Sequence, residues 1–211
     1  MKITVFGATG PAGLLLVEKA LLSGHQVTVY ARSPDKITII HNSLLVIKGE
    51  LKAVDQVQEA ISGADAVISL LGPKKKSTNL DIFSGMKAII SGMHKHGVRR
   101  LIAAVSSSFR DPKDKFQFGF DFSVVMLQVL AKSILKDIVC TGTEVAESSL
   151  DWTIVRLPML SNKPATGKLN IGYTGDGIVN FFSLRRADLA DFIITQLQDA
   201  TYVHQAPVVS N

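Results

Sequence analysis

The beginning of the chain is the feature that most constrains its fold. A short apolar run, Ile3-Thr4-Val5-Phe6, leads into Gly7-Ala8-Thr9-Gly10-Pro11-Ala12-Gly13 and then into the apolar segment Leu14-Leu15-Leu16-Val17. The β-branched and aromatic residues of the first run predict a strand, and the last segment predicts a helix. Three glycines between a strand and a helix predict a tight turn whose backbone can approach a bound group closely.

The spacing of the glycines gives each of them a separate role. Gly7 permits the turn out of the strand, Gly10 lets the backbone approach a pyrophosphate, and Gly13 lets the helix pack closely on the sheet. A helix start here presents free N–H groups and a positive dipole end to phosphate. The pattern therefore predicts a dinucleotide site, with an ordinary strand–turn–helix of small residues as the alternative. The residues predicted to bind the cofactor in this turn are Gly7, Thr9, Gly10, Pro11, Ala12 and Gly13.

The length and composition of the chain limit its class. A chain of 211 residues suits a single α/β domain over residues 1–211, a Rossmann-like doubly wound parallel sheet flanked by helices with a small C-terminal region that covers the substrate. The single cysteine, Cys140, excludes an internal disulfide and favours a reducing, cytoplasmic compartment. The first apolar run is too short for a signal peptide, and no run reaches membrane-spanning length, so we expect no membrane partner.

The charge of the chain gives no sign of a nucleic-acid partner. The formal net charge is +5, but the basic residues are scattered or in short clusters without interleaved aromatic residues. We therefore expect a small-molecule partner and no nucleic acid. A monomer and a homodimer both remain open.

The end of the second predicted strand favours one cofactor over another. After Gln26–Tyr30, NAD sites usually place an acidic residue that holds the ribose 2′-hydroxyl. This chain has Arg32 and Ser33 there, which can offer a guanidinium fork and a hydroxyl to a 2′-phosphate. We predict that both bind the cofactor and that NADP(H) is preferred over NAD(H). A solvated loop arginine is the alternative.

Hydrophobic periodicity predicts the remaining elements. Lys74, Lys75 and Lys76 follow the fourth predicted strand at the carboxyl edge of the sheet, where ligands of α/β proteins bind. Lys74 is predicted to contact the cofactor, with an ordinary solvated loop as an equal alternative. The predicted strands cover 44–47, 64–72, 99–108, 152–155 and a terminal edge strand 206–209; the predicted helices cover 11–22, 53–61, 80–95 and 123–148, and 163–177 reads as a loop or short hairpin.

Several segments resemble one family. The GxxGxxG spacing resembles that of atypical and extended short-chain dehydrogenase/reductases. The combination of segments resembles more specifically the biliverdin-IXβ reductase/flavin reductase group of the atypical enzymes and the related NmrA-like NAD(P)H-binding proteins. The segments that carry this resemblance are Val5–Gly10, Ala66–Gly72, His96–Arg100, Ser107–Phe109 and Asp151–Pro158.

The resemblance implies roles for residues at the ends of the strands. It places Ser107 beside the nicotinamide and the substrate, and Phe109 in the wall of the substrate pocket. Met159 stands where reductases of the group can carry a histidine, in a segment expected to turn over the site mouth from Arg156 to Leu160. Glu50 replaces the usual aspartate near the adenine. Together with Glu50, the residues expected at the cofactor are Leu51, Leu71, Gly72 and Ser106.

The catalytic motif usual for short-chain dehydrogenases is absent from the sequence. None of the three tyrosines, Tyr30, Tyr173 and Tyr202, is followed four residues later by lysine. We therefore expect an NADPH-dependent oxidoreductase that transfers hydride to a flat conjugated acceptor, such as a flavin, a quinone or a biliverdin-like molecule. Ser107 would orient the reactants, and water would supply the proton. The alternative is a non-catalytic NADP(H)-binding redox sensor of the NmrA-like type; an epimerase or dehydratase of nucleotide sugars is disfavoured by the missing tyrosine.

The segment after Ser107 predicts a flap. Residues 110–120 are polar, and Phe116, Phe118 and Phe120 alternate among them. Such a loop can cover a site, and its rings can stack on a flat heteroaromatic ligand. The alternative is that the three rings anchor the loop to the core.

Overall fold

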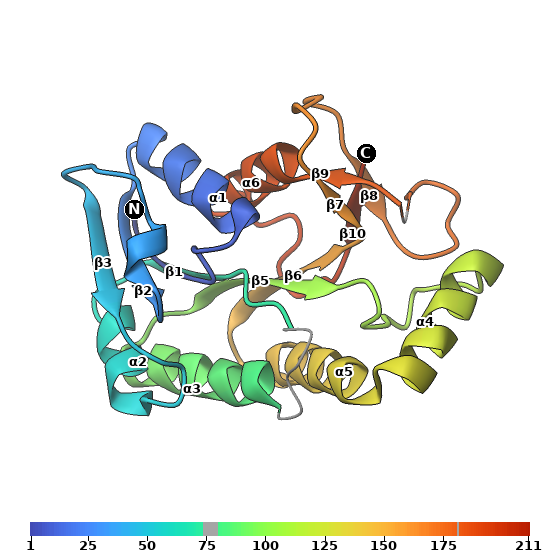
Figure 1. Cartoon of the computed structure of the whole chain (residues 1–211), viewed down its shortest axis with the longest axis horizontal. Helices are drawn as coiled ribbons and strands as arrows, with labels where there is room; N and C mark the ends of the chain where they lie inside the picture. Colours follow the sequence, from blue (N-terminus) through green and yellow to red (C-terminus); the bar gives the residue numbers. More distant parts are fainter. Residues whose placement is uncertain (74–79, 181) are drawn as a thin grey trace.

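The computed structural model describes residues 1–73, 80–180 and 182–211, which form a sheet with helices on both faces (Figure 1). The helices are α1 (Pro11–Leu22), α2 (Val54–Ile61), α3 (Asp81–Lys95), α4 (Phe118–Leu130), α5 (Lys132–Glu147) and α6 (Arg186–Thr195), with a 3-10 turn, η1 (Pro34–Lys36). The strands are β1 (Lys2–Phe6), β2 (Gln26–Ala31), β3 (Leu44–Lys48), β4 (Ala66–Ser69), β5 (Arg100–Ser106), β6 (Asp151–Leu157), β7 (Leu160–Ser161), β8 (Asn170–Gly172), β9 (Leu184–Arg185) and β10 (Val208–Ser210).

The order of the strands confirms the predicted doubly wound fold. The main sheet runs β3-β2-β1-β4-β5-β6-β10-β8, and β7 pairs with β9 in a small second sheet. All pairings in the main sheet are parallel except that of β8 with β10. The chain order reverses between β1 and β4, and in such sheets ligands bind outside the carboxyl ends of the strands at this reversal.

The alternation of side chains along the strands builds a core on each face of the sheet. In β1, Val5 packs with the residues of α1 and α6, whereas the next residue, Phe6, packs with those of α2, α3 and α5. In β4, Ile68 and Val67 divide in the same way. Because the strands are covered on both sides, they read in the sequence as continuous apolar runs.

The prediction of a single helix over 123–148 is wrong, because the segment contains two helices. The axes of α4 and α5 are bent by 116° at Ala131, whose φ of −146° is not helical. The helix also begins earlier than predicted, at Phe118, inside the segment expected to be a loop. The apolar residues continue across the break, so periodicity alone does not reveal it. Among the described helices, none alone is long and apolar enough to cross a membrane; α4 and α5 meet that test of length and composition only when taken as one bent pair.

The C-terminal strand lies inside the sheet rather than at its edge. The predicted edge strand 206–209 corresponds to β10, which pairs with β6 on one side and β8 on the other. The edge is formed by β8, within the segment 163–177 that reads as a loop or hairpin. Its three residues are too few to give a periodic signal in the sequence.

Candidate nucleotide-binding site

Backbone contacts at the glycine turn leave no room for side chains. Gly7 has a φ of 84°, and a Cβ there would lie 2.5 Å from the carbonyl carbon and oxygen of Leu70. A Cβ on Gly13 would lie 2.5 Å from the Cα of Ala8. The turn that leaves β1 therefore presses against both the segment that leaves β4 and the first turn of α1. These two glycines have the structural roles that their spacing predicts.

Gly10 differs from the other two glycines because it faces open space. A Cβ there would meet only the Gly7 carbonyl oxygen, at 3.8 Å. Gly10 precedes α1 and has no side chain to cap it, and the amide of Leu14 donates to the Gly10 carbonyl oxygen at 2.9 Å. The earlier amides of the first turn, those of Ala12 and Gly13, have no acceptor within the helix. With no acidic residue in this turn and no side-chain cap, the positive end of α1 is not neutralised by its own residues.

The turn has the backbone features that the predicted phosphate cradle needs, and its contacts with a cofactor stay predictions. Its first-turn proline, Pro11, stands at the start of α1, and Thr9 is half-buried beside it. Backbone N–H groups, a helix dipole and a space that a Cβ would fill are the features that hold a pyrophosphate. The residues that the structure brings together here are Gly7, Thr9, Gly10, Pro11, Ala12 and Gly13.

A group of polar residues follows β2. Arg32 comes directly after the strand and is exposed, and Ser33 precedes the 3-10 turn. The turn adds Lys36, an exposed cation that sequence reasoning missed, together with the exposed acid Asp35. The backbone amide of Lys36 donates to the Ser33 carbonyl oxygen at 3.3 Å, which closes the turn. The sequence signal that could have indicated this is Ser33-Pro34, which is typical of the start of a helical turn and would bring Lys36 back toward the end of β2.

The residues expected near the adenine have structural roles that the sequence did not predict. The Glu50 carboxylate forms an exposed ion pair with Lys52 at 2.9 Å, and the Glu50 carbonyl oxygen accepts a hydrogen bond from the Tyr30 hydroxyl at 3.0 Å. Leu51 fills the space beside Gly85, where a Cβ would come within 2.7 Å of its Cδ1. The roles of Glu50 and Leu51 in binding stay predictions.

The segment that leaves β4 passes the glycine turn at the carboxyl edge. Leu71 is half-buried against the core, whereas Gly72 is exposed and has no heavy atom within 4 Å of the position of a Cβ. The Leu71 amide nitrogen adjoins Gly7, at 2.9 Å from the position of a Cβ there, and the contacts of Leu71 and Gly72 with a cofactor stay predictions. Lys74, with its neighbours Lys75 and Lys76, lies outside the described residues.

Three serines end β5, and one of their hydroxyls is uncommitted. The hydroxyls of Ser106 and Ser108 lie 3.2 Å apart, and the Ser108 amide donates to the Ser106 hydroxyl at 3.3 Å. Ser107 donates its amide to the Leu157 carbonyl oxygen at 2.9 Å and is 7% exposed. Among the described residues, no side-chain hydrogen bond includes its hydroxyl, whereas the hydroxyls of Ser106 and Ser108 are engaged with each other. Of the three serine hydroxyls in this turn, it is therefore the one that can bind a ligand without losing a hydrogen bond to the others.

Phe109 and Met159 lie on either side of the turn formed by Ser106, Ser107 and Ser108 (the serine turn), in different environments. The ring of Phe109 packs on α5, where a Cβ at Gly142 would overlap it. Met159, two residues beyond the end of β6, is 68% exposed. Phe109 thus contributes to the core as well as to the edge of the sheet, and both assignments to a substrate pocket stay predictions.

A buried ion pair below the serine turn was missed by sequence reasoning. Arg156 was expected in a turn over the site mouth, but it lies in β6 with a fully buried side chain. Its guanidinium binds the Asp114 carboxylate with two hydrogen bonds, of 2.6 and 2.9 Å. Its Nε donates to the Ala206 carbonyl oxygen at 2.6 Å, and its Nη1 donates to that of Phe109 at 3.2 Å.

The ion pair anchors the segment that was expected to be a flap. The Asp114 carboxylate also accepts hydrogen bonds from the amides of Asp111 and Thr174, both at 2.9 Å. Burial by itself raises the pKa of Asp114, but the hydrogen bonds from Arg156 and these amides outweigh it and lower the pKa. The flap interpretation is therefore wrong for residues around Asp114. Of the three alternating rings, Phe120 is buried in the core, as in the anchoring alternative, whereas Phe116 and Phe118 are exposed.

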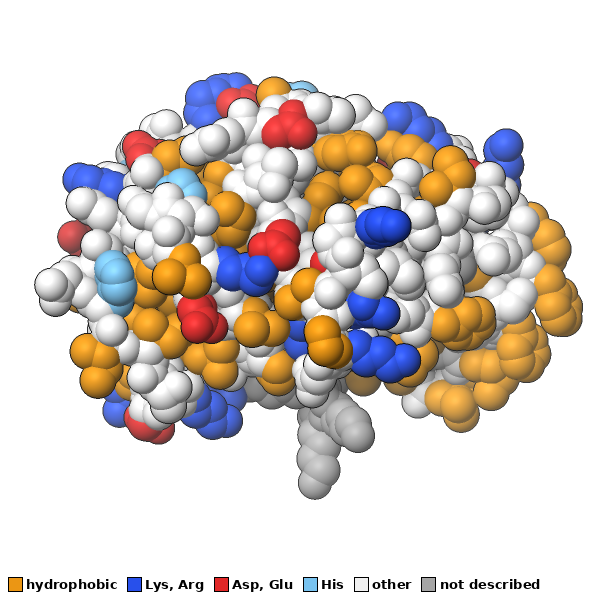
Figure 2. Space-filling view, turned by 90° about the horizontal axis from the view of Figure 1, so that it is seen from above, with side chains coloured by type: hydrophobic (Ala, Val, Ile, Leu, Met, Phe, Trp, Pro, Cys, Tyr) orange, Lys and Arg blue, Asp and Glu red, His pale blue; other side chains and the backbone are white. Residues whose placement is uncertain are grey.

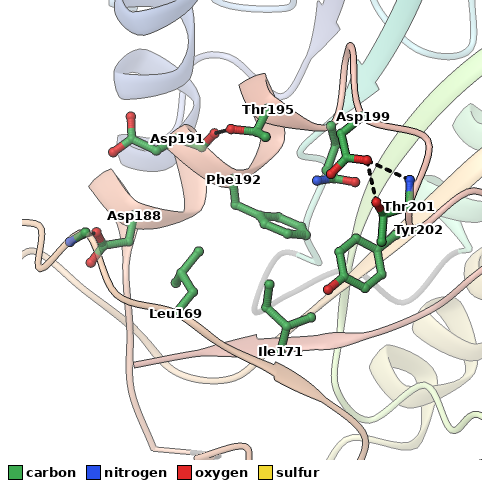
Figure 3. Close-up of a pocket in the computed structure, with 11 residues that line it drawn as sticks. Leu169, Ile171, Asp188, Asp191, Phe192, Thr195, Asp199, Thr201 and Tyr202 are labelled. Carbon is green, nitrogen blue, oxygen red and sulfur yellow. Dashed lines mark hydrogen bonds between the residues drawn. The ribbon is translucent and has the colours of Figure 1, made fainter.

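A separate cavity of about 380 Å³ lies along α6 (Figure 3). Its apolar side chains Leu169, Ile171, Phe192 and Tyr202 face one another, and Asp191 points away from them toward α1, where it pairs with Lys19. None of the predicted site residues lines this cavity. Among the described residues, no group of histidine, cysteine, aspartate and glutamate side chains has the geometry of a metal site.

The sheet and the cradle define a dinucleotide-binding Rossmann protein. The family described as NAD(P)H-binding matches residues 7–200. The chain therefore belongs to this NAD(P)H-binding family.

Three known proteins illustrate the relationship. The UPF0659 protein YMR090W of Saccharomyces cerevisiae is 26% identical over 210 residues, which cover 93% of this chain and 87% of the yeast protein. The photosystem II assembly factor Ycf39 of Synechocystis is 26% identical over 163 residues, covering 74% of this chain but 44% of that protein. A short-chain dehydrogenase/reductase from Veillonella parvula in complex with NADP has a TM-score of 0.82 and 21% identity, with 100% of this chain and 94% of that one covered.

Proposed function

We propose that this protein is an NADPH-dependent reductase of a flat conjugated acceptor, such as a flavin, a quinone or a biliverdin-like molecule. The observation that supports the proposal is the Ser107 hydroxyl, which makes no hydrogen bond within its turn and follows β5 at the carboxyl edge of the sheet, the edge where the glycine turn lies. A reduced nicotinamide supplies a hydride when it is bound. Residues of this chain would bind the rest of the cofactor: the turn at Gly10 binds the pyrophosphate, and Arg32 with Lys36 binds the 2′-phosphate.

The part of Ser107 in this proposal is orientation. A serine hydroxyl is a poor acid at neutral pH, so it positions the nicotinamide or acceptor by hydrogen bonding, and the proton comes from water. Good orientation is worth about 7–11 kcal/mol of the barrier in favourable intramolecular cases. The three tyrosines have other surroundings: the Tyr30 hydroxyl donates to the Glu50 carbonyl oxygen, and that of Tyr173 lies 3.2 Å from both the Lys113 amine and the Gln205 amide oxygen. Tyr202 lines the separate cavity along α6.

Replacing Ser107 by alanine should lower turnover by about tenfold, the effect of one lost hydrogen bond in the transition state. The affinity for NADPH should stay nearly unchanged because the phosphate cradle is intact. Stopped-flow oxidation of NADPH and titration of its fluorescence separate these two quantities. The matched control is Ser108→Ala in the same turn, which should retain turnover, and equal activity of the Ser107 variant and the wild type would remove Ser107 from the mechanism.

Replacing Arg32 by glutamine should weaken NADPH binding by about tenfold and leave NADH binding unchanged, because the guanidinium interacts with the 2′-phosphate that only NADPH carries. Arg99→Gln is the control, since it removes the same charge from an exposed arginine that pairs with Asp151. Calorimetric titration of both nucleotides measures the effect. A parallel loss for NADPH and NADH would show that Arg32 does not read the phosphate.

A second candidate is a non-catalytic sensor of the NADPH/NADP ratio. It is favoured by the absence of Tyr-x-x-x-Lys and by the commitment of two tyrosine hydroxyls to other contacts. The relative Ycf39 is named as an assembly factor rather than as an enzyme. Oxidation of NADPH by FMN, a quinone and biliverdin, with NADH as the cofactor control, separates the two functions. Tight NADPH binding without oxidation by any acceptor would favour the sensor.

A further inference from the structure

Helix α4 exposes an apolar surface that the fold does not cover. Among the residues of this helix, Phe120 alone is buried. The exposed fractions reach 75% for Phe118 and 72% for Val129. We call the exposed apolar residues of this helix and the residue two positions before it the α4 patch, which consists of Phe116, Phe118, Phe122, Val125, Met126, Val129 and Leu130.

The α4 patch forms one end of the molecule. In Figure 1, α4 projects at the right, beyond the arrowhead of β5, and a loop before β9 lies next to it. Phe120 packs near Val179 of that loop, whose neighbour Ile178 is 58% exposed. Figure 2 shows hydrophobic side chains gathered at the same end. The patch is therefore continuous with a second apolar segment rather than a scatter of single residues, and monomeric proteins rarely leave such a surface open.

The acidic residue within α4 would not oppose burial of the patch. The Asp121 carboxylate accepts hydrogen bonds from Arg110 at 2.9 Å and from the Gln117 amide at 2.7 Å, so it is already paired at the start of the helix. The rings of Phe118 and Phe122 stack with their centroids 6.4 Å apart. The surface they form can therefore leave water without stranding a charge.

Lysines border the patch at both ends of the helix. Exposed Lys115 precedes Phe116, and exposed Lys132 and Lys136 follow Leu130. Asp121 is the only acidic residue in the sequence from Lys115 to Lys136. A partner that covers the patch must therefore tolerate positive charge at both ends.

This charge pattern selects among the partners that an apolar face can have. In a symmetric dimer the patch would meet its own copy, so lysines at its ends would meet lysines. An anionic lipid surface matches the pattern, because acyl chains accept the phenylalanine, valine and leucine side chains while the headgroups attract lysine. The helix has 13 residues, or about 20 Å, which is too short to cross the hydrocarbon core of about 30 Å but suits a position parallel to its surface.

We propose that the α4 patch docks the protein onto anionic membranes, with α4 lying in the headgroup region. The sequence-based expectation of no membrane partner rests on the lack of a spanning segment, which surface docking does not need. The proposal is independent of catalysis, since it uses no residue of the cradle or of the serine turn.

Cosedimentation with lipid vesicles tests the proposal. The full chain should bind vesicles of phosphatidylcholine with phosphatidylglycerol. The double variant Phe118→Ser, Val129→Ser should bind at least about tenfold more weakly, because it lacks two apolar side chains that the membrane would bury. The control is Leu22→Ser, Ile40→Ser, which replaces two residues 82% and 98% exposed outside the patch and should bind as the wild type does. Circular dichroism of each variant verifies folding. Equal binding by the patch variant and the wild type would overturn the proposal.

Two further measurements separate the lipid surface from other partners. The variant Lys132→Gln, Lys136→Gln should lose about fivefold in affinity per lysine, and phosphatidylcholine vesicles without anionic lipid should bind the wild type weakly. Full binding in either case would contradict the part assigned to charge. Sedimentation velocity without vesicles tests a second copy: a dimer that Phe118→Ser, Val129→Ser abolishes would assign the patch to self-association and overturn the membrane proposal.

Discussion

Replacing Asp114 by asparagine is expected to lower the free energy of unfolding by about 3–5 kcal/mol, the usual effect of removing one partner of a buried ion pair. The guanidinium of Arg156 is fully buried and would lose its anionic partner and one of its two carboxylate hydrogen bonds while remaining charged, with the new amide NH2 group facing it. The amide of Thr174 would also lose a charged acceptor. Because a domain is typically stable by about 5–15 kcal/mol, this one change removes a large share of that stability.

Urea denaturation of the wild type and two variants measures the effect. The control is Asp111→Asn in the same segment, whose carboxylate accepts a hydrogen bond from the amide of Lys113. Asparagine retains an oxygen for that bond, so the control should lose less than about 1 kcal/mol. Similar losses in the two variants would show that the Arg156 pair has no special weight.

The difference between the wild type and the Asp114 variant should also depend on pH. The folded-state pKa of Asp114 lies below its unfolded value of about 3.9, so its contribution to stability is present above that value. As the pH falls through the folded-state pKa, the carboxylate is protonated and the contribution is lost. The two unfolding curves should therefore converge in acid.

Replacing Gly10 by valine is expected to weaken NADPH binding by about 100-fold or more, equivalent to about 2.7 kcal/mol. The Gly10 backbone, with φ −81° and ψ 162°, is extended and accepts a β-branched residue. A Cβ there would touch only the Gly7 carbonyl oxygen at 3.8 Å, so the fold tolerates the side chain. The added methyl groups would instead occupy space at the start of α1, where we propose that the pyrophosphate binds.

Calorimetric titration with NADPH and thermal unfolding without it separate the two effects. The matched contrast is Gly13→Ala, whose smaller side chain meets the backbone of Ala8 and should destabilise the protein even without a ligand. Unchanged NADPH affinity in a folded Gly10 variant would place the cofactor elsewhere. Loss of folding in that variant would mean that Gly10, like Gly13, serves the packing of the turn.

The elements that the sequence predicts correctly are those set by residues close together along the chain. The bounds of α1 agree with the prediction at both ends, because glycine and proline mark its start and Ser23-Gly24 marks its end. The break at Ala131 could not be predicted, because apolar residues run through it and the bend depends on how α5 packs on α3. Nor could the partner of Arg156, since Asp114 lies 42 residues away and a charged residue near a strand end resembles a loop residue.

The contact between Gly7 and Leu70 has a thermodynamic consequence. Since the backbone leaving β1 touches the backbone leaving β4 with no side chain between them, the two segments form one rigid unit at the reversal of the sheet. A nucleotide that binds here as proposed would meet amides that are already aligned, so the protein would lose little backbone entropy in ordering them. If Arg32 and Ser107 bind the two ends of the ligand as proposed, selectivity among nucleotides would arise there rather than from closure of the protein around the centre of the ligand.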